Sequence, residues 1–143
     1  MDPRALLNDW TREWLLSRDA VNRRIVSIDQ KNENEASGLL VVHRSDGDQR
    51  VIIQPILEGN WSSEAATANM IVTLNTPENV RAVVSEWSVL VKNEKLLVVF
   101  CNPKARGDQK WIVKPSTHNK IADSSSLRQG LLTMSEQVET LKE

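Results

Sequence analysis

The clearest indication of the fold class comes from residues 70–100, MIVTLNTPENVRAVVSEWSVLVKNEKLLVVF. The apolar and β-branched residues 70–74 predict a strand. Thr76, Pro77 and Glu78 predict a helix start, because Thr caps orphan amides, Pro fits the first turn and an acid complements the helix dipole. The continuous apolar run within 95–100 predicts a strand that is buried on both faces. This order of strand, helix and strand predicts a parallel pair joined by a right-handed crossover.

Apolar residues at helical spacing predict one helix between these two strands, stabilised by burial. They are Val80, Val83, Val84, Trp87, Leu90 and Val91. Upstream, residues 39–44 and 50–54 predict a hairpin with Asp46-Gly47 in its turn, because Asp-Gly accepts the positive φ angles that such turns require. Residues 24–28 form a shorter β-branched run that suits a strand or a helix extension, and residues 29–38 predict a polar loop.

Helices are also predicted at both ends of the chain. Asp2 and Pro3 suit a helix start, and an apolar stripe follows, formed by Leu6, Leu7, Trp10 and Trp14. Residues 110–114 predict a strand that Pro115 stops, and a polar loop is expected as far as Ser125. Ser126 then has the capping-box spacing to Gln129. The helix that follows carries a seam formed by Leu127, Leu131, Met134, Val138 and Leu141.

These elements predict a single α/β domain over residues 1–143, with a mixed β-sheet flanked by helices. No apolar run approaches the ~20 residues that cross a bilayer, and the start has no secretory apolar segment, so no membrane partner is expected. One cysteine excludes an internal disulfide and suits a reducing cytoplasm. With 18 basic and 19 acidic residues, the net charge of -1 does not indicate a globally basic nucleic-acid binder.

The order of a helix, hairpin-bearing strands, a helix and a buried strand over residues 3–115 is similar to the core of restriction-endonuclease-like proteins. That family includes archaeal Holliday-junction resolvases and many repair nucleases. The segments Asn102-Pro103, Trp111-Ile112-Val113 and His118-x-Lys120-Ile121-Ala122-Asp123 also resemble an uncharacterised archaeal family. The first resemblance implies a restriction-endonuclease-like topology, in which an acid on the second core strand and Glu-x-Lys on the third hold magnesium and position water.

The matching positions of this chain depart from that pattern. His43 stands on the strand where the acid is expected, and Gln54 and Ile56 stand where Glu and Lys are expected. Metal-dependent hydrolysis needs clustered carboxylates to neutralise the ion. The resemblance therefore implies a nuclease-like fold whose catalytic motif is absent, and neither a cofactor nor a metal is expected.

The densest chemical feature is the stretch 104–120, which has five basic residues and one acid, Asp108. Its lysines would neutralise phosphates and its tryptophan would stack on a base. Its histidine, in the polar loop expected after residue 115, could bind an anion or move a proton. The candidate nucleic-acid-binding residues are Lys104, Arg106, Lys110, Trp111, Lys114, His118 and Lys120. The simpler interpretation is a solvated hairpin whose lysines guard a sheet edge.

Other chemistry-bearing residues favour structural roles. Cys101 follows a buried strand and suits a small buried hydrophobe better than a nucleophile, which would need a base such as His43 or His118. Asp46 and Asp48 flank Gly47, but no downstream glutamate completes a calcium loop. The sequence contains neither a Gly-x-Gly-x-x-Gly nor a Walker pattern.

Three functions remain open, and a non-catalytic function is favoured over an enzymatic one. The first is a non-catalytic binding or assembly module with a nuclease-like fold, which contacts nucleic acid through residues 104–120. The second is a metal-dependent nuclease with migrated carboxylates, drawn from Glu58, Glu64, Glu86 or Asp123. The third is a structural subunit that forms a homodimer through the seam of the last helix, because its four-three spacing suits both core packing and pairing with a second copy.

Overall fold

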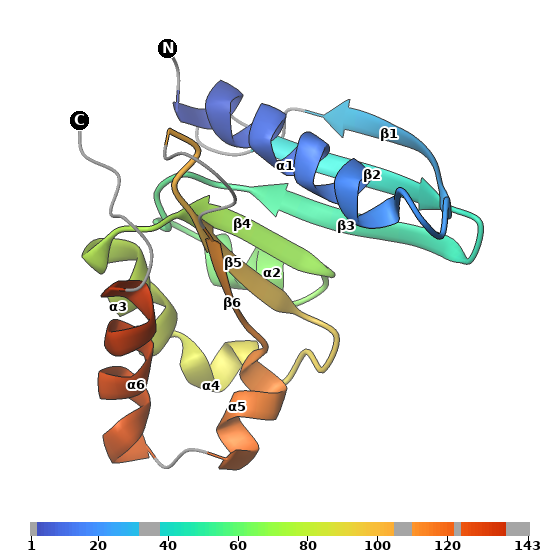
Figure 1. The fold of residues 1–143 in the computed structure, drawn as a ribbon. Coiled ribbons are helices and arrows are strands. Elements are labelled where there is room, and N and C mark those ends of the chain that lie inside the picture. Colours follow the sequence, from blue (N-terminus) through green and yellow to red (C-terminus); the bar gives the residue numbers. More distant parts are fainter. Residues whose placement is uncertain (1–2, 32–37, 105–109, 122–123, 137–143) are drawn as a thin grey trace.

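One mixed six-stranded sheet organises the chain, and its strand order follows the sequence from β1 to β6 (Figure 1). The computed structural model describes residues 3–31, 38–104, 110–121 and 124–136. At 119–121, 124–126 and 128 it describes the backbone and not the side chains. The elements are α1 (Pro3–Asp19), β1 (Ile25–Lys31), β2 (Gly38–Arg44), β3 (Gly47–Ile53), α2 (Trp61–Ala65), β4 (Met70–Leu74), α3 (Pro77–Ser85), α4 (Trp87–Leu90), β5 (Leu97–Cys101), β6 (Lys110–Val113), α5 (Pro115–Ile121) and α6 (Ser124–Glu136). The predicted α/β class with a mixed sheet is confirmed.

The parallel pair predicted from residues 70–100 is present. β4 pairs with β5 in parallel from Met70↔Leu97 to Leu74↔Cys101, and β3 is parallel to β4. The crossover begins as predicted, because the Thr76 side chain accepts a hydrogen bond from the Asn79 backbone N–H at 3.2 Å. The single predicted helix is wrong in one respect. It breaks at Glu86, whose φ of -104° and ψ of 13° separate α3 from α4.

The predicted hairpin is confirmed, but its turn is shifted by one residue. β2 and β3 are antiparallel and Arg44 pairs with Gly47, so Ser45 and Asp46 form the turn. Gly47 takes the positive φ, 129°, that favours glycine. Asp46 does not share it, because Arg23 is the one non-glycine with positive φ among the residues described.

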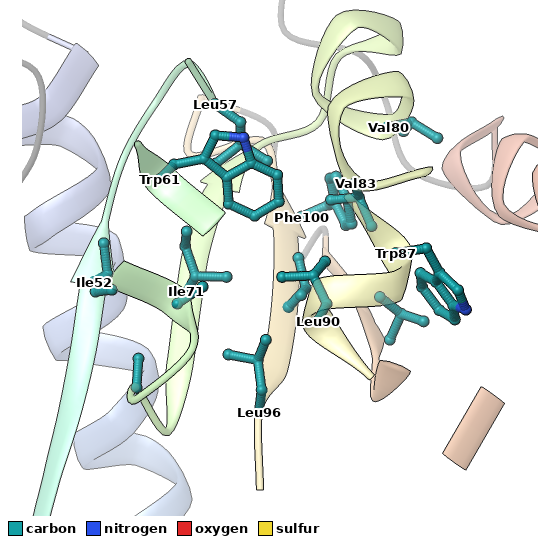
Figure 2. Packing of buried hydrophobic residues seen from close by; sticks show 14 of the residues in the cluster. Ile52, Leu57, Trp61, Ile71, Val80, Val83, Trp87, Leu90, Leu96 and Phe100 are labelled. Atoms are coloured by element: carbon teal, nitrogen blue, oxygen red, sulfur yellow. The ribbon is translucent and has the colours of Figure 1, made fainter. Parts of the chain in front are cut away.

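Two hydrophobic clusters cover the two faces of the sheet. α1 lies on one face, where its Leu7, Trp14 and Leu15 are buried against residues such as Val72. The remaining helices lie on the other face. Figure 2 shows Ile71 and Phe100 of the sheet facing Val83 and Leu90 of α3 and α4. The strands β4 and β5 are therefore buried on both sides, as continuous apolar runs predict.

Within the apolar stripe predicted for α1, Leu6 and Trp10 are only half-buried. Trp10 instead stacks on Trp14, with ring centroids 5.4 Å apart.

Three polar segments differ from the sequence-based expectation. Residues 29–31 extend β1, because they pair with residues 39–41 of β2. Residues 115–121 form α5 rather than a loop, with Pro115 at the first helical position, where its missing N–H costs nothing. α6 begins at Ser124, so Ser126 lies inside the helix and the predicted capping box is wrong.

The seam of the last helix packs on the domain where the structure describes it. Leu127 and Leu131 belong to the core cluster and Met134 packs against it, because α6 lies on α3. Val138 and Leu141 lie outside the described residues. None of the helices described is long and apolar enough to span a membrane.

A buried amide joins the crossover to the loop after β3. Asn79 is 2% exposed, and its Oδ1 accepts the Leu57 backbone N–H at 2.9 Å. Its Nδ2 donates to the carbonyl oxygens of Pro55 and Leu74, each at 2.8 Å. One side chain thus bonds three backbone groups. The carbonyl oxygens of Pro55 and Leu74 also accept from the Thr73 hydroxyl and the Thr76 backbone N–H, respectively, so the Leu57 N–H is the group that depends most on Asn79.

We expect Asn79→Ala to lower the free energy of unfolding by about 1–3 kcal/mol, because the buried Leu57 N–H loses its partner and keeps its desolvation penalty. Urea denaturation measures this change. The control, Arg81→Ala, lies on the exposed side of the same helix and should change stability by less than about 0.5 kcal/mol. An Asn79→Ala protein as stable as the parent would contradict the role given to this amide.

Candidate functional site

The described residues among those predicted to bind nucleic acid lie at different ends of β5 and β6, in the core and in α5. Lys104 is exposed beyond the end of β5, and Lys110 and Lys114 lie at opposite ends of β6. Lys120 belongs to α5, but its side chain is not described, and Arg106 lies outside the described residues.

Trp111 is a core residue, and the expectation that it stacks on a base is wrong. It is 6% exposed, and its ring stacks on Phe100 with centroids 4.2 Å apart and planes 7° apart. Its Nε1 donates to Asn75 Oδ1 at 2.9 Å. Alternation along β6 explains this position. Trp111 and Val113 face the side of the sheet that α3, α4 and α6 cover, while Lys110 and Lys114 fall on the side that α1 covers.

His118 lies in a helix and not in the polar loop that the sequence suggested. It is half-buried, and its Nδ1 lies 3.1 Å from the Lys114 carbonyl oxygen and 3.3 Å from the Lys114 backbone nitrogen. The ring therefore serves the first turn of α5.

A cavity of about 420 Å³ opens where α1 ends, on the side of the sheet where the parallel strands begin. Seven elements or their flanking loops, α1 and the six strands, contribute to its lining. The residues are Leu15, Arg18, Asp19, Asn22, Ile25, Arg44, Gln49, Asn69, Met70, Lys95, Leu97 and Lys114. Of the predicted candidates whose side chains the structure describes, Lys114 is the one that lines it. The other three cations, Arg18, Arg44 and Lys95, carry no local motif that sequence reasoning could have used.

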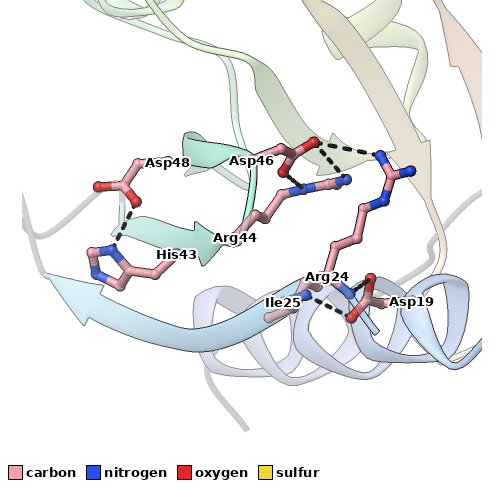
Figure 3. Close-up of polar contacts among 7 residues, drawn as sticks. All are labelled: Asp19, Arg24, Ile25, His43, Arg44, Asp46 and Asp48. Atoms are coloured by element: carbon pink, nitrogen blue, oxygen red, sulfur yellow. Dashed lines mark hydrogen bonds and ion pairs between the residues drawn. The ribbon is translucent and has the colours of Figure 1, made fainter. Parts of the chain in front are cut away.

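The lining of this cationic cavity has four basic side chains and one acid. The acid, Asp19, is already engaged, because its two carboxylate oxygens accept the backbone N–H groups of Arg24 and Ile25 at 2.8 and 2.7 Å (Figure 3). The remaining charge is positive and would attract an anion.

Two of the four cations are held in place by neighbours. Arg44 Nε donates to Asp46 Oδ1 at 2.9 Å (Figure 3), which also lowers the pKa of the Asp46 carboxyl. The Arg18 guanidinium lies 4.9 Å from the centroid of the Trp14 ring. The Lys110 ammonium lies 5.5 Å from the same centroid, so one cation of α1 and one of β6 each lie near the same indole.

The carboxyl ends of the parallel strands, where ligands of α/β proteins commonly bind, are occupied by buried amides. Gln54, Asn75 and Asn102 follow β3, β4 and β5 and are each at most 4% exposed. Gln54 Nε2 donates to the carbonyls of Ile56 and Glu58, and Asn75 Nδ2 donates to that of Ser135. These amides bond to the backbone of neighbouring segments.

The described carboxylates among those suggested as a migrated metal site do not form a metal-binding group. Within the described ranges, no three His, Cys, Asp or Glu side chains could hold a metal ion together. Glu58, Glu64 and Glu86 are in that described part, and Asp123 is outside it. Cys101 is fully buried on the α1 face, as expected for a structural cysteine.

His43 on β2 links the first three strands, because its ring lies between an aspartate of β1 and an aspartate of β3. His43 Nε2 lies 2.7 Å from Asp29 Oδ2 on β1, and its Nδ1 lies 3.0 Å from Asp48 Oδ1 on β3; Figure 3 shows the second contact. These hydrogen bonds, that to Asp29 first, raise the pKa of His43 above 6.5. The protonated ring can donate to both carboxylates at once.

Comparison with known protein families, curated proteins and solved structures finds no match to this chain.

We expect His43 to stabilise the fold below its unfolded-state pKa of 6.5 and to lose this contribution as the pH rises through its higher folded-state value. The difference in urea midpoint between the parent and His43→Gln should therefore shrink from acidic to alkaline pH. In an Asp29→Asn background, the difference in urea midpoint caused by His43→Gln should be smaller at acidic pH, because one hydrogen-bond partner of the ring has lost its charge. A difference that is constant with pH would contradict the raised pKa.

Proposed function

We propose that this protein is a non-catalytic nucleic-acid-binding module that holds phosphate groups at the cationic cavity. The observation that carries the proposal is the convergence of four basic side chains on one hollow whose single acid is engaged by backbone amides. Phosphate neutralisation by Lys and Arg supplies most of the sequence-independent affinity of such modules.

Two of the four cations, Lys95 and Lys114, carry most of the support for this proposal, because their charges are the ones available to a ligand. Arg44 and Arg18 are oriented by Asp46 and Trp14. Lys95 and Lys114 form no ion pair with a carboxylate in the part of the chain that the structure describes, and both are exposed. They flank β5 and β6 at the same end of the sheet, since Val98 pairs with Val113. An anion between them would relieve their mutual repulsion.

The proposed kinship with restriction-endonuclease-like proteins rests on element order. An N-terminal helix, an antiparallel meander and a parallel crossover occur in the order from which the resemblance was drawn. The absence of a catalytic site in the proposal rests on His43 and Gln54, which stand where the family has acids and here bind Asp29, Asp48 and backbone carbonyls. A buried single cysteine suits the reducing cytoplasm in which we place the protein.

We expect Lys95→Ala/Lys114→Ala to weaken binding of a single-stranded oligonucleotide and to lower the slope of log K against log salt by roughly 1.4, or about 0.7 for each lost phosphate contact. Fluorescence anisotropy at several salt concentrations measures the slope. Arg81→Ala removes one charge from the exposed side of α3 and should leave the slope unchanged. An unaltered slope in the folded double variant, or no binding by the parent at low salt, would refute the proposal.

We also expect no cleavage of single- or double-stranded DNA by the purified protein with magnesium or manganese, because clustered carboxylates are needed to hold the ion. A labelled oligonucleotide resolved on a denaturing gel provides the assay. Metal-dependent cleavage that disappears in Glu58→Ala or Glu64→Ala would instead establish a nuclease with migrated carboxylates.

A further inference from the structure

The cationic cavity has two chemically different parts. Its basic side chains come from α1, β2 and the residues that flank β5 and β6. Four apolar residues also line the cavity and offer a weakly polar surface, here called the apolar floor: Leu15, Ile25, Met70 and Leu97. Simple attraction of a passing phosphate backbone requires only the first part, so the second part indicates a ligand with an apolar portion.

The size of the cavity also favours a single small group. About 420 Å³ lies within the roughly 300–1,000 Å³ range of pockets that enclose one small molecule. Gln49, Asn22 and Asn69 also line the cavity. The Asn69 Oδ1 already accepts the Arg50 backbone N–H at 3.0 Å, so Gln49 and Asn22 are the amides to which we assign a polar edge of the ligand. Asn69 is fixed between strands, because its backbone N–H donates to Arg50 and its carbonyl accepts from Leu97.

The carboxyl end of α1 lies at the cavity, and the partial negative charge of a helix carboxyl end would repel an anion. Hydrogen bonds to its last carbonyl groups reduce this repulsion. Carbonyl groups of its last turn are engaged, since the Ala20 N–H donates to Ser17 and the Arg23 N–H donates to Asp19. The Asp19 carboxylate is held by two further backbone amides. The groups left to meet a ligand are therefore the lysines, the arginines, the amides and the apolar floor.

We propose that the cavity binds one phosphorylated nucleotide, with its phosphate between Lys95 and Lys114 and its nucleoside against the apolar floor. This inference rests on the proposed function and deepens it. The same chemistry has two sources, the phosphorylated end of a nucleic-acid strand and a free mononucleotide.

The test uses the full chain and two labelled single-stranded oligonucleotides that differ only at the unlabelled 5′ end, which carries a phosphate or a hydroxyl. We expect the phosphorylated strand to bind about tenfold more tightly, the effect of one charge-assisted hydrogen bond. Lys114→Ala should abolish the preference, whereas Arg81→Ala should retain it. Adenosine monophosphate should displace the strand, and adenosine and inorganic phosphate should do so much less. Thermal unfolding checks that each variant is folded.

The outcomes separate this inference from the function on which it rests. Binding of adenosine monophosphate that depends on Lys114, without a preference for the phosphorylated strand, supports the cavity and identifies the free nucleotide as its ligand. Equal binding of both strands together with no effect of the mononucleotide overturns the inference, and a salt-dependent affinity for both strands would still leave the nucleic-acid-binding function in place. No binding of either strand or of the mononucleotide overturns both.

Discussion

The parallel pairing of β4 with β5 is the constraint on which the rest of the structure depends. Parallel strands cannot be joined by a tight turn, so the chain must leave the sheet and return across one face. α3 and α4 make that crossing and cover the face with Val83 and Leu90. The opposite face of the same strands is equally apolar, so α1 must cover it with Leu7 and Trp14. A three-layer arrangement therefore follows from burying two strands on both sides.

The same pairing gives the two ends of the sheet different chemistry. At the carboxyl ends the chain repeatedly turns into buried loops, and the backbone groups there need partners, which Gln54, Asn75 and Asn79 supply. At the amino ends α1 terminates and leaves a hollow, toward which Lys95 and Lys114 converge. The two ends of the sheet therefore differ in chemistry, with neutral amides bonded to backbone at one end and basic side chains around a cavity at the other.

Local patterns predicted the elements whose signals lie within a few residues. Thr76-Pro77 marked the start of α3, and the apolar runs of β4 and β5 appeared within a residue or two of their bounds. The polar end of β1, which depends on pairing with β2, and the helix α5 were not predicted. β1 continues through polar residues to Lys31 because β2 lies beside it, and α5 forms in a polar segment after Pro115. Trp111 resembled an exposed aromatic among lysines until its cross-strand neighbour Phe100 was known.

The order of residues alone is sufficient for the α/β class, the hairpin, the parallel crossover and the lack of a recognisable catalytic motif, because periodicity, capping and turn chemistry act between near neighbours. Tertiary structure alone brings Arg18, Arg44, Lys95 and Lys114 to one cavity. It also decides which face of β6 each lysine occupies and places His43 between Asp29 and Asp48. These arrangements depend on strand register and on the position of α1 over the sheet, and a shift of one residue in register would turn every side chain to the other face.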